Sequence, residues 1–591
     1  MRRSLTFTLG SLLLLLAAAT VSLPATAEAG GGGRDPLAGI KHIVVIYEEN
    51  HSFDNLWGGW PVVDGLSRDP TRTPRQTQVD RNGQPFDCLL QDDVNLTTSA
   101  DPAPNGGLSP SCSTNPPAAF NSHFPNQVFD IGQFITPEST TCFDASPQAP
   151  FGPANGVPNG TGEPGGCTRD LVHRFYQEPY QIDGGRMDRY TVGSDAVGLT
   201  QGYYDTRSLP LFKFLTSDKH APRYVIADHF FQSAFGGSFL NHQWLIAAQT
   251  PKFEGSTPQD GSTNDLHSIV GTDGHPNNTY PLHSGPVWPA PGGVKDGPLT
   301  EAADPATGKC APPAGAPTPP PGTVCGDFAV NTIQPTFQPF QPGTPPARQL
   351  PPSHNTNIGD LLSAKGISWN WYSGGWDNAA GNVGGRGWTN GNGPTCSDPD
   401  TFANATFPNC PNVLFQFHHQ PFNYYQGYGP GQPGRSHLKD EQDFLADLRA
   451  GDLPAVSFVK PVGEENEHPG YTNVTTGEQH LVGLLKAIQA DKRDWSSTLV
   501  VVTYDEFGGQ WDHVPPPTAP GISDQWGPGT RIPAMLLSDR LPQRSAVDHT
   551  TYDTVSILST IEDRFGLRAL SSRDAADHSL GNAMRRGLPR L

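Results

Sequence analysis

Short, almost continuously apolar segments are the feature that most constrains the fold of this chain. Residues 40–47 read IKHIVVIY and residues 498–504 read TLVVVTY, and both are rich in β-branched side chains. Segments of this length and composition are typical of strands that are covered on both faces, as in parallel sheets. Further segments of this kind lie at 224–227, 367–371, 455–459 and 532–537.

Helical patterns lie between these segments, with apolar residues spaced as on one face of a helix. Strands that alternate with helices predict an α/β fold, a doubly wound and mostly parallel sheet sandwiched by helices. The predicted helices are 206–216, 241–248, 357–365, 436–450, 477–490 and 552–565.

Three long stretches rich in proline, glycine and asparagine interrupt the predicted elements, at about 65–165, 250–350 and 373–412. Structureless loops of this length are unusual unless they are functional or tied down. Each stretch contains cysteines. We therefore interpret them as disulfide-stapled insertions that surround the mouth of a site.

The first residues are typical of an export signal. Arg2 and Arg3 precede an apolar run at 9–19, and two A-x-A cleavage motifs follow, which predicts removal of residues 1–29. The run is shorter than the roughly 20 residues that span a bilayer, and no later segment approaches that length, so we expect no transmembrane segment. The chain is predicted to be secreted, extracellular or periplasmic, and the arginine pair leaves a twin-arginine route open.

The eight cysteines support this compartment, because an even number without a C-x-x-C pair favours disulfides in an exported chain. The local pairs Cys310–Cys325 and Cys396–Cys410 are expected. Three connectivities remain open for the first four, Cys88, Cys112, Cys142 and Cys167.

The formal net charge of −20 argues against nucleic acid or an anionic membrane as a partner. Both would require a basic face.

Acidic residues follow two of the predicted strands directly. Glu48 and Glu49, and then Asn50, follow the first, and Asp505 and Glu506 follow the segment 498–504. The carboxyl ends of parallel strands form the ligand-binding edge of such sheets. Carboxylates gathered there repel one another unless a cation lies between them. The pattern predicts one divalent metal ion, Mg²⁺, Ca²⁺ or Mn²⁺, since these ions prefer oxygen ligands. The alternative is that each pair is a solvated strand end or a helix cap.

Ser238 lies in the segment FGGSFLNH, after two glycines and at the start of a helical pattern. The glycines allow a tight turn, and a helix N-terminus favours an anion. A nucleophile that accepts a phosphoryl group would suit this position. The alternative is that Ser238 is only the N-cap of the helix.

Several histidines lie in polar segments punctuated by glycine and proline. Imidazolium near a phosphate neutralises charge and can protonate a leaving oxygen, although a single loop histidine is more often a surface residue. The candidates are His173, His418, His419, His468, His513 and His549.

Longer motifs resemble a known family. ENHSFD at 49–54 resembles the E-N-R-S-F-D signature of the bacterial phosphoesterase family that contains secreted acid phosphatases and phosphatidylcholine-type phospholipases C. DEFGG at 505–509, with WDHV at 511–514, resembles its D-E-H-G-G…DHV segment. Matches at 172–188, 235–250 and 552–567 follow the same order. The resemblance implies one alkaline-phosphatase-like domain over 38–575 that hydrolyses phosphate esters through a hydroxyl nucleophile beside a metal.

The resemblance also implies roles for individual residues. Glu49, Asn50, Asp505 and Glu506 match metal ligands, and Ser238 matches the nucleophile. Three histidines match residues around the phosphate with catalytic roles, and we expect Asn50 and two further histidines to bind substrate. The first three are His173, His419 and His468, and the other two are His418 and His513.

This chain departs from the family pattern at His51, where arginine is usual, and at Phe507, where histidine is usual. Ser238 in a G-G-S-x-x-N-H context is typical of the acid phosphatases, whereas the phospholipases carry threonine. We therefore expect a broad phosphomonoesterase. The alternatives are a phospholipase C or other phosphodiesterase acting on choline-type phospholipids, and a non-catalytic protein that binds a phosphate ligand.

Overall fold

The computed structural model describes most of the predicted sheet and helices. The predicted signal peptide and most of the three insertions lie outside the described residues. Those are 35–66, 77–80, 83–90, 123–133, 135–138, 171–175, 177–194, 197–251, 329–331, 335–340, 349–395, 415–469 and 471–591.

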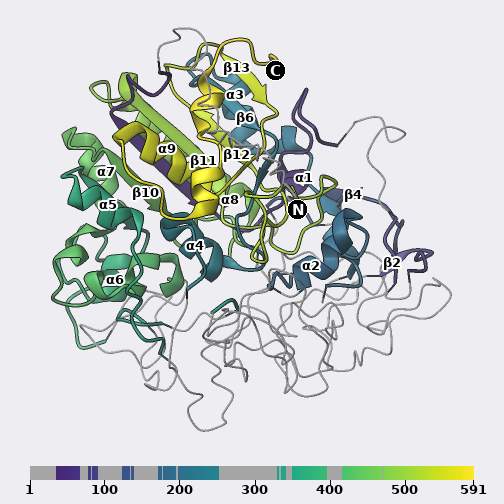
Figure 1. The fold of residues 1–591 in the computed structure, drawn as a ribbon, viewed down its shortest axis with the longest axis horizontal. Helices are drawn as coiled ribbons and strands as arrows, with labels where there is room; N and C mark the ends of the chain where they lie inside the picture. The colour runs from purple at the N-terminus through teal and green to yellow at the C-terminus, as the bar shows by residue number, and fades with distance from the viewer. Residues whose placement is uncertain are drawn as a thin grey trace, which may run out of the picture.

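A sheet of eight strands forms the centre of the described part (Figure 1). Its order is β13-β6-β12-β11-β1-β10-β8-β9, and only β12 runs antiparallel to its neighbours. The mostly parallel α/β sheet is thereby confirmed. The strands are β1 (His42–Glu48), β6 (Tyr224–Ala227), β8 (Trp369–Ser373), β9 (Leu438–Asp440), β10 (Val456–Lys460), β11 (Thr498–Tyr504), β12 (Ala534–Leu537) and β13 (Ser545–Asp548).

The central strands are buried on both faces, which explains their continuous apolar sequences. Every residue of β10 and β11 is buried. Helices supply the cover: α8 contacts both α3 and α7, and α4 contacts both α5 and α9. Figure 1 shows α9 in front of the strands. The bounds are α3 (Pro210–Ser217), α4 (Ser238–Ala247), α5 (Ile358–Ala364), α7 (Glu441–Ala450), α8 (Val474–Ala490) and α9 (Val555–Phe565).

Shorter elements connect these layers. None of the helices in the described ranges is long and apolar enough to cross a membrane. The short helices are α1 (Phe53–Leu56), α2 (Gln177–Ile182), α6 (Trp376–Ala380) and α10 (Ser572–Ala576), and the short strands are β2 (Leu89–Leu90), β3 (His123–Phe124), β4 (Phe129–Asp130), β5 (Gly202–Tyr203), β7 (Phe230–Phe231) and β14 (Tyr552–Asp553).

The disulfide prediction falls almost wholly outside the described residues. Cys88 alone lies within them, where it is buried and is not a free cysteine. The pairs Cys310–Cys325 and Cys396–Cys410 lie outside, so these pairings stay predictions.

Candidate active site

Neighbouring strands bring the two acidic segments together. Glu48 at the end of β1 is paired with Tyr504 at the end of β11, and the Asp505 backbone N–H donates to the Glu48 carbonyl over 3.1 Å. Glu49 and Asp505 therefore leave adjacent parallel strands side by side. All three carboxylates, Glu49, Asp505 and Glu506, are fully buried.

Glu49 contacts Lys460, a residue that was not predicted as part of the site. The Lys460 ammonium, at the end of β10, is 2.6 Å from Glu49 Oε1 and donates to the Tyr47 carbonyl over 2.9 Å. His419 Nε2 is 2.7 Å from the same oxygen. Burial alone would raise the pKa of Glu49, but the Lys460 charge holds it below its ordinary value.

Asp505 lies close to both Glu49 and the predicted nucleophile, Ser238. Burial and the charge of Glu49 raise the pKa of Asp505 well above its ordinary value, and the neighbouring Ser238 hydroxyl offsets part of this rise. Its Oδ1 accepts from the Glu506 N–H over 2.8 Å. Glu506 Oε1 is in turn 3.6 Å from His173 Nε2. The site therefore connects both acidic segments to Ser238 and His173.

Ser238 is the first residue of α4 and is 7% exposed. The cap of this helix is Gly237, so the N-cap interpretation of Ser238 is wrong. The turn before it requires glycine at Gly236, because its φ is +87° and an added Cβ would lie 2.4 Å from the Phe175 nitrogen. The His173 ring lies against Gly237, the residue that precedes Ser238 in sequence.

A buried acid that we did not predict holds this glycine turn. Glu178, in α2, accepts from the Gly236 N–H over 2.6 Å, from the Thr530 N–H over 2.6 Å and from Gln232 over 2.9 Å. Burial raises its pKa to about 7. Glu178 thus fixes the backbone that precedes Ser238.

Three of the predicted histidines, His418, His419 and His468, lie near Glu49, together with His242. His468 Nε2 is 3.7 Å from Glu49 Oε2 and 3.0 Å from Asn50 Nδ2. His419, in a short 3₁₀ helix, stacks on His242 of α4 with ring centroids 5.1 Å apart, and His418 lies 4.5 Å from His419. Burial lowers the pKa of His242, His418 and His419 well below the ordinary value, so these rings are neutral near pH 7.

His242 and Lys460 each had a signal in the sequence. His242 follows Ser238 by four residues and therefore lies on the same face of α4. Its Nδ1 contacts the Ser238 carbonyl at 2.7 Å. Lys460 directly follows the predicted strand 455–459 at the ligand-binding edge of the sheet.

The structure does not bring His513 or His549 into this group. His513 Nδ1 is 2.6 Å from Asp54, and its Nε2 is 3.1 Å from Asp64. His549 contacts Asp228. These residues form a separate cluster.

Two features bear on a metal ion at the site. Asn50 Oδ1 is buried and has no hydrogen-bond partner in the described part of the chain, as expected for an oxygen that coordinates a cation. Ligand atoms of Glu49, His242 and His419 lie within 4.8 Å of one another. This group shares Glu49 with the predicted oxygen ligands and adds two nitrogen donors.

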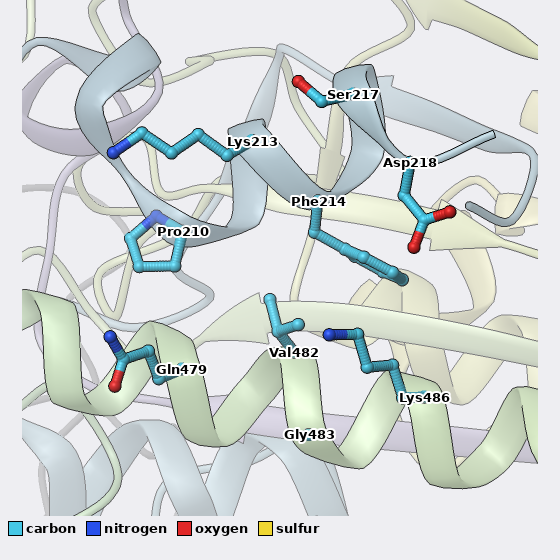
Figure 2. A pocket seen from close by; sticks show the side chains of 9 residues that line it. All are labelled: Pro210, Lys213, Phe214, Ser217, Asp218, Gln479, Val482, Gly483 and Lys486. Atoms are coloured by element: carbon cyan, nitrogen blue, oxygen red, sulfur yellow. The ribbon is translucent and has the colours of Figure 1, made fainter. Parts of the chain in front are cut away.

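The described part of the chain contains a large groove and a much smaller cavity. A groove of about 540 Å³ lies between α3 and α8, and no predicted site residue lines it (Figure 2). A smaller and mainly apolar cavity, about 30 Å³ in volume, is lined by Leu171 and Pro469, which neighbour His173 and His468 in sequence.

Comparisons with known proteins identify the family of this chain. A model of the Phosphoesterase family matches residues 40–568. "Phospholipase C A" of Mycobacterium tuberculosis (strain CDC 1551 / Oshkosh) is 33% identical over 161 residues, which are 24% of this chain and 29% of that protein. "Non-specific phospholipase C6" of Arabidopsis thaliana is 28% identical over 160 residues, 22% of this chain and 30% of that protein. The matched parts are thus less than a third of these relatives.

A solved protein of the alkaline phosphatase superfamily from Vibrio parahaemolyticus is 14% identical. The match covers 39% of this chain and 51% of that one, with a TM-score of 0.20. A likeness this weak supports no conclusion about the fold.

Proposed function

Because the chain belongs to the Phosphoesterase family, whose model covers most of its length, we propose that it is a metal-dependent hydrolase of phosphate esters that acts through Ser238. The carrying observation is the position of Ser238. Ser238 is the first residue of α4, where free backbone N–H groups favour a phosphate. Its hydroxyl is close to Asp505, which follows β11, and β11 pairs with β1, the strand that precedes Glu49.

The residues of the site fit a divalent cation. Glu49 and Asp505 are buried side by side. Among the described residues, Lys460 is the one permanently charged cation in contact with Glu49. Buried carboxylates without balancing charge are costly, so a bound cation would stabilise this pair of carboxylates. A bound ion held by Glu49, Asn50, Asp505 and Glu506 would supply positive charge to the nucleophile and to the phosphoryl oxygens.

In the proposed reaction, Ser238 loses its hydroxyl proton to solvent, its Oγ attacks phosphorus as the alkoxide, and the ester oxygen leaves on the opposite side. The N-terminus of α4 stabilises the charge on the phosphoryl oxygens. His173, which lies against Gly237 and is 17% exposed, is placed to protonate the leaving alcohol. Water then hydrolyses the phosphoserine and releases phosphate. His418 and His419, being neutral, contribute N–H donors rather than charge.

The oxygen ligands favour Mg²⁺, Ca²⁺ or Mn²⁺. Use of His242 and His419 as additional ligands would favour a zinc-like ion instead. Elemental analysis of the purified protein distinguishes the two sets: Asp505→Asn should lose the metal if the oxygen set binds it. His419→Gln should lose the metal only if the nitrogen donors take part.

We favour a phosphomonoester as substrate, because Ser238 lies in the G-G-S-x-x-N-H context typical of the acid phosphatases. A phospholipase C is the second candidate, favoured by the names of the curated relatives.

The deciding experiment compares hydrolysis of p-nitrophenyl phosphate and p-nitrophenyl phosphorylcholine, with and without chelator. We expect faster turnover of the monoester, loss of both activities with chelator, and recovery when the divalent ion is restored. A strong preference for the phosphorylcholine ester would establish the second candidate. Activity that survives complete metal removal would exclude the metal-dependent mechanism.

We further propose that the mature protein is exported and that its cysteines are paired. N-terminal sequencing should find a start after residue 29 or nearby. Peptide mapping without reduction should join Cys310 to Cys325 and Cys396 to Cys410, and free thiols at these positions would contradict the assigned compartment.

A further inference from the structure

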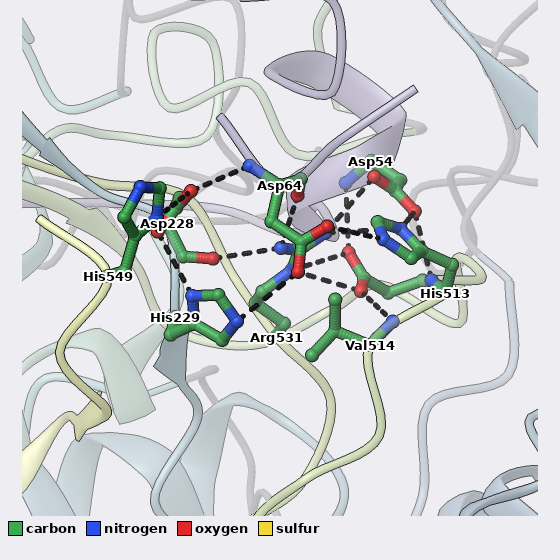
Figure 3. Close-up of polar contacts among 9 residues, drawn as sticks. Asp54, Asp64, Asp228, His229, His513, Val514, Arg531 and His549 are labelled. Carbon is green, nitrogen blue, oxygen red and sulfur yellow. Dashed lines mark hydrogen bonds and ion pairs between the residues drawn. The ribbon is translucent and has the colours of Figure 1, made fainter. Parts of the chain in front are cut away.

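A second cluster of metal-binding side chains lies two strands away from the candidate active site. Asp228 directly follows β6 and His549 directly follows β13, and these strands pair in parallel with Ala227 opposite Asp548. The two side chains therefore leave the sheet together near its β13 edge, and β12 lies between β6 and β11. Figure 3 shows them with His229 and Asp64.

The spacing of the polar atoms suits one small cation. Asp228 Oδ1 is 3.0 Å from His229 Nδ1 and 2.9 Å from His549 Nδ1. Asp64 Oδ2 is 3.3 Å from His229 Nε2. Ligand atoms of Asp228, His229 and His549 all lie within 4.8 Å of one another. Four ligands arranged tetrahedrally at zinc–nitrogen distances would be separated by about 3.3 Å.

The cluster is anchored on one side and open on the other. Asp228 is fully buried, and its Oδ2 accepts from the Asp64 N–H over 2.7 Å. The side chains of His549 and Asp64 are 46% and 47% exposed. An ion could therefore enter from solvent and meet a carboxylate that is already fixed in place.

The arginine beside the cluster does not form an ion pair with Asp64 or Asp228. The nearest arginine, Arg531, donates to the backbone carbonyls of Asp64 and Asp228, while its ion pairs go to Asp54 and Asp512. The described partners of the Asp64 and Asp228 carboxylates are histidines and backbone N–H groups, including His513 at 3.1 Å from Asp64.

We propose that Asp228, His229 and His549 bind a zinc-like divalent ion. Two imidazoles and one carboxylate leave a fourth position for water and suit zinc, whereas the oxygen ligands near Ser238 suit a harder ion. The ion would connect the edge strand β13 to the end of β6. Its expected role is to stabilise this edge of the sheet, and it is independent of the proposed hydrolysis.

Titration of the demetallated full-length chain with Zn²⁺ and with Co²⁺ tests this proposal, with equilibrium dialysis and elemental analysis as readouts. We compare the wild type with His549→Gln, which changes an exposed ligand, and with His220→Gln, a control at an exposed histidine outside the cluster. We expect His549→Gln to bind one equivalent fewer than the wild type, or to bind it at least tenfold more weakly, and to lose the Zn²⁺-dependent rise in thermal midpoint. His220→Gln should match the wild type.

Cobalt absorption adds a readout of the ligands themselves. The wild type should show the strong visible bands of tetrahedral Co²⁺ with nitrogen ligands, and His549→Gln should lack them. Equal stoichiometry, spectra and midpoints in the wild type and in His549→Gln would overturn the proposal and leave the cluster as a network of ion pairs between histidines and aspartates.

Discussion

Lys460 places a permanent charge beside Glu49, with 2.6 Å between Nζ and Oε1, in a fully buried environment. Removal of one partner of a buried pair costs about 3 kcal/mol or more, because the other charge is left without compensation. Lys460→Met should therefore lower the free energy of unfolding by about 3 kcal/mol after chelation. It should lower it by less in the metal-loaded protein, where the ion also neutralises Glu49.

Urea unfolding with and without chelator measures this difference, and Lys492→Met, at an exposed lysine, is the control. A cost of Lys460→Met that is the same in both conditions would mean that Lys460 and the ion do not share Glu49.

Ser238 is the residue on which the proposed mechanism depends most directly. Because Gly237 rather than Ser238 caps α4, Ser238→Ala should cost less than the roughly 1 kcal/mol of a lost cap. Turnover should fall at least about a thousandfold, equivalent to roughly 4 kcal/mol of barrier. Ser238→Thr should retain activity if the hydroxyl alone is required.

Trapping with substrate at low pH should label Ser238 in the wild type and no residue in Ser238→Ala. A variant that keeps a third of wild-type turnover would show that water attacks phosphorus directly.

At the scale of elements, the apolar pattern predicted the strands in the centre of the sheet and failed at its edges. The segments 224–227 and 498–504 coincide with β6 and β11. The edge strands β9 and β13 read LKD and SAVD, too short and too polar to stand out. The predicted helix 436–450 includes β9, since its spacing continues into α7. The direction of β12 could not be predicted, because burial on both faces gives the same pattern in either direction.

The same limit applies to the candidate site. Residues that directly follow strands, such as Glu49 and Asp505, could be placed side by side because the sheet fixes their spacing. The glycines before Ser238 likewise marked a turn. Glu178 could not be found, since it lies on a short helix and reaches the turn only through the tertiary fold.

One contact between elements should make stability depend on pH. His480 of α8 lies 3.1 Å from Glu441, the first residue of α7. Burial alone would lower the pKa of His480, but the Glu441 carboxylate raises it to about 9. A folded-state pKa above the unfolded value of about 6.5 stabilises the protein fully below pH 6.5. That contribution is lost as the pH rises through 9.

The difference in unfolding free energy between the wild type and His480→Gln should therefore shrink by roughly 2–3 kcal/mol between pH 6 and 10. Chemical denaturation across this range provides the measurement, and His220→Gln should parallel the wild type. A difference that is constant with pH would show that His480 is not charged in the folded protein.

At the scale of the whole molecule, the formal charge of −20 opposes the approach of the proposed substrate. A phosphomonoester carries close to two negative charges at neutral pH, whereas a phosphorylcholine ester is zwitterionic. Salt shortens the range of the protein's field from about 30 Å at 0.01 M to about 8 Å at 0.15 M. Raising the ionic strength over this range should increase kcat/KM for p-nitrophenyl phosphate several-fold, mainly through KM.

The phosphorylcholine ester, measured with the same preparation, serves as the control and should respond little, because its net charge is zero. The comparison separates the field of the whole protein from that of the site. If kcat/KM for the monoester falls with salt, the local positive charge of Lys460 and the bound ion outweighs the acidic surface at the distances where substrate is captured. If both esters respond equally, salt acts on the protein itself, and the acidic charge has no part in substrate selection.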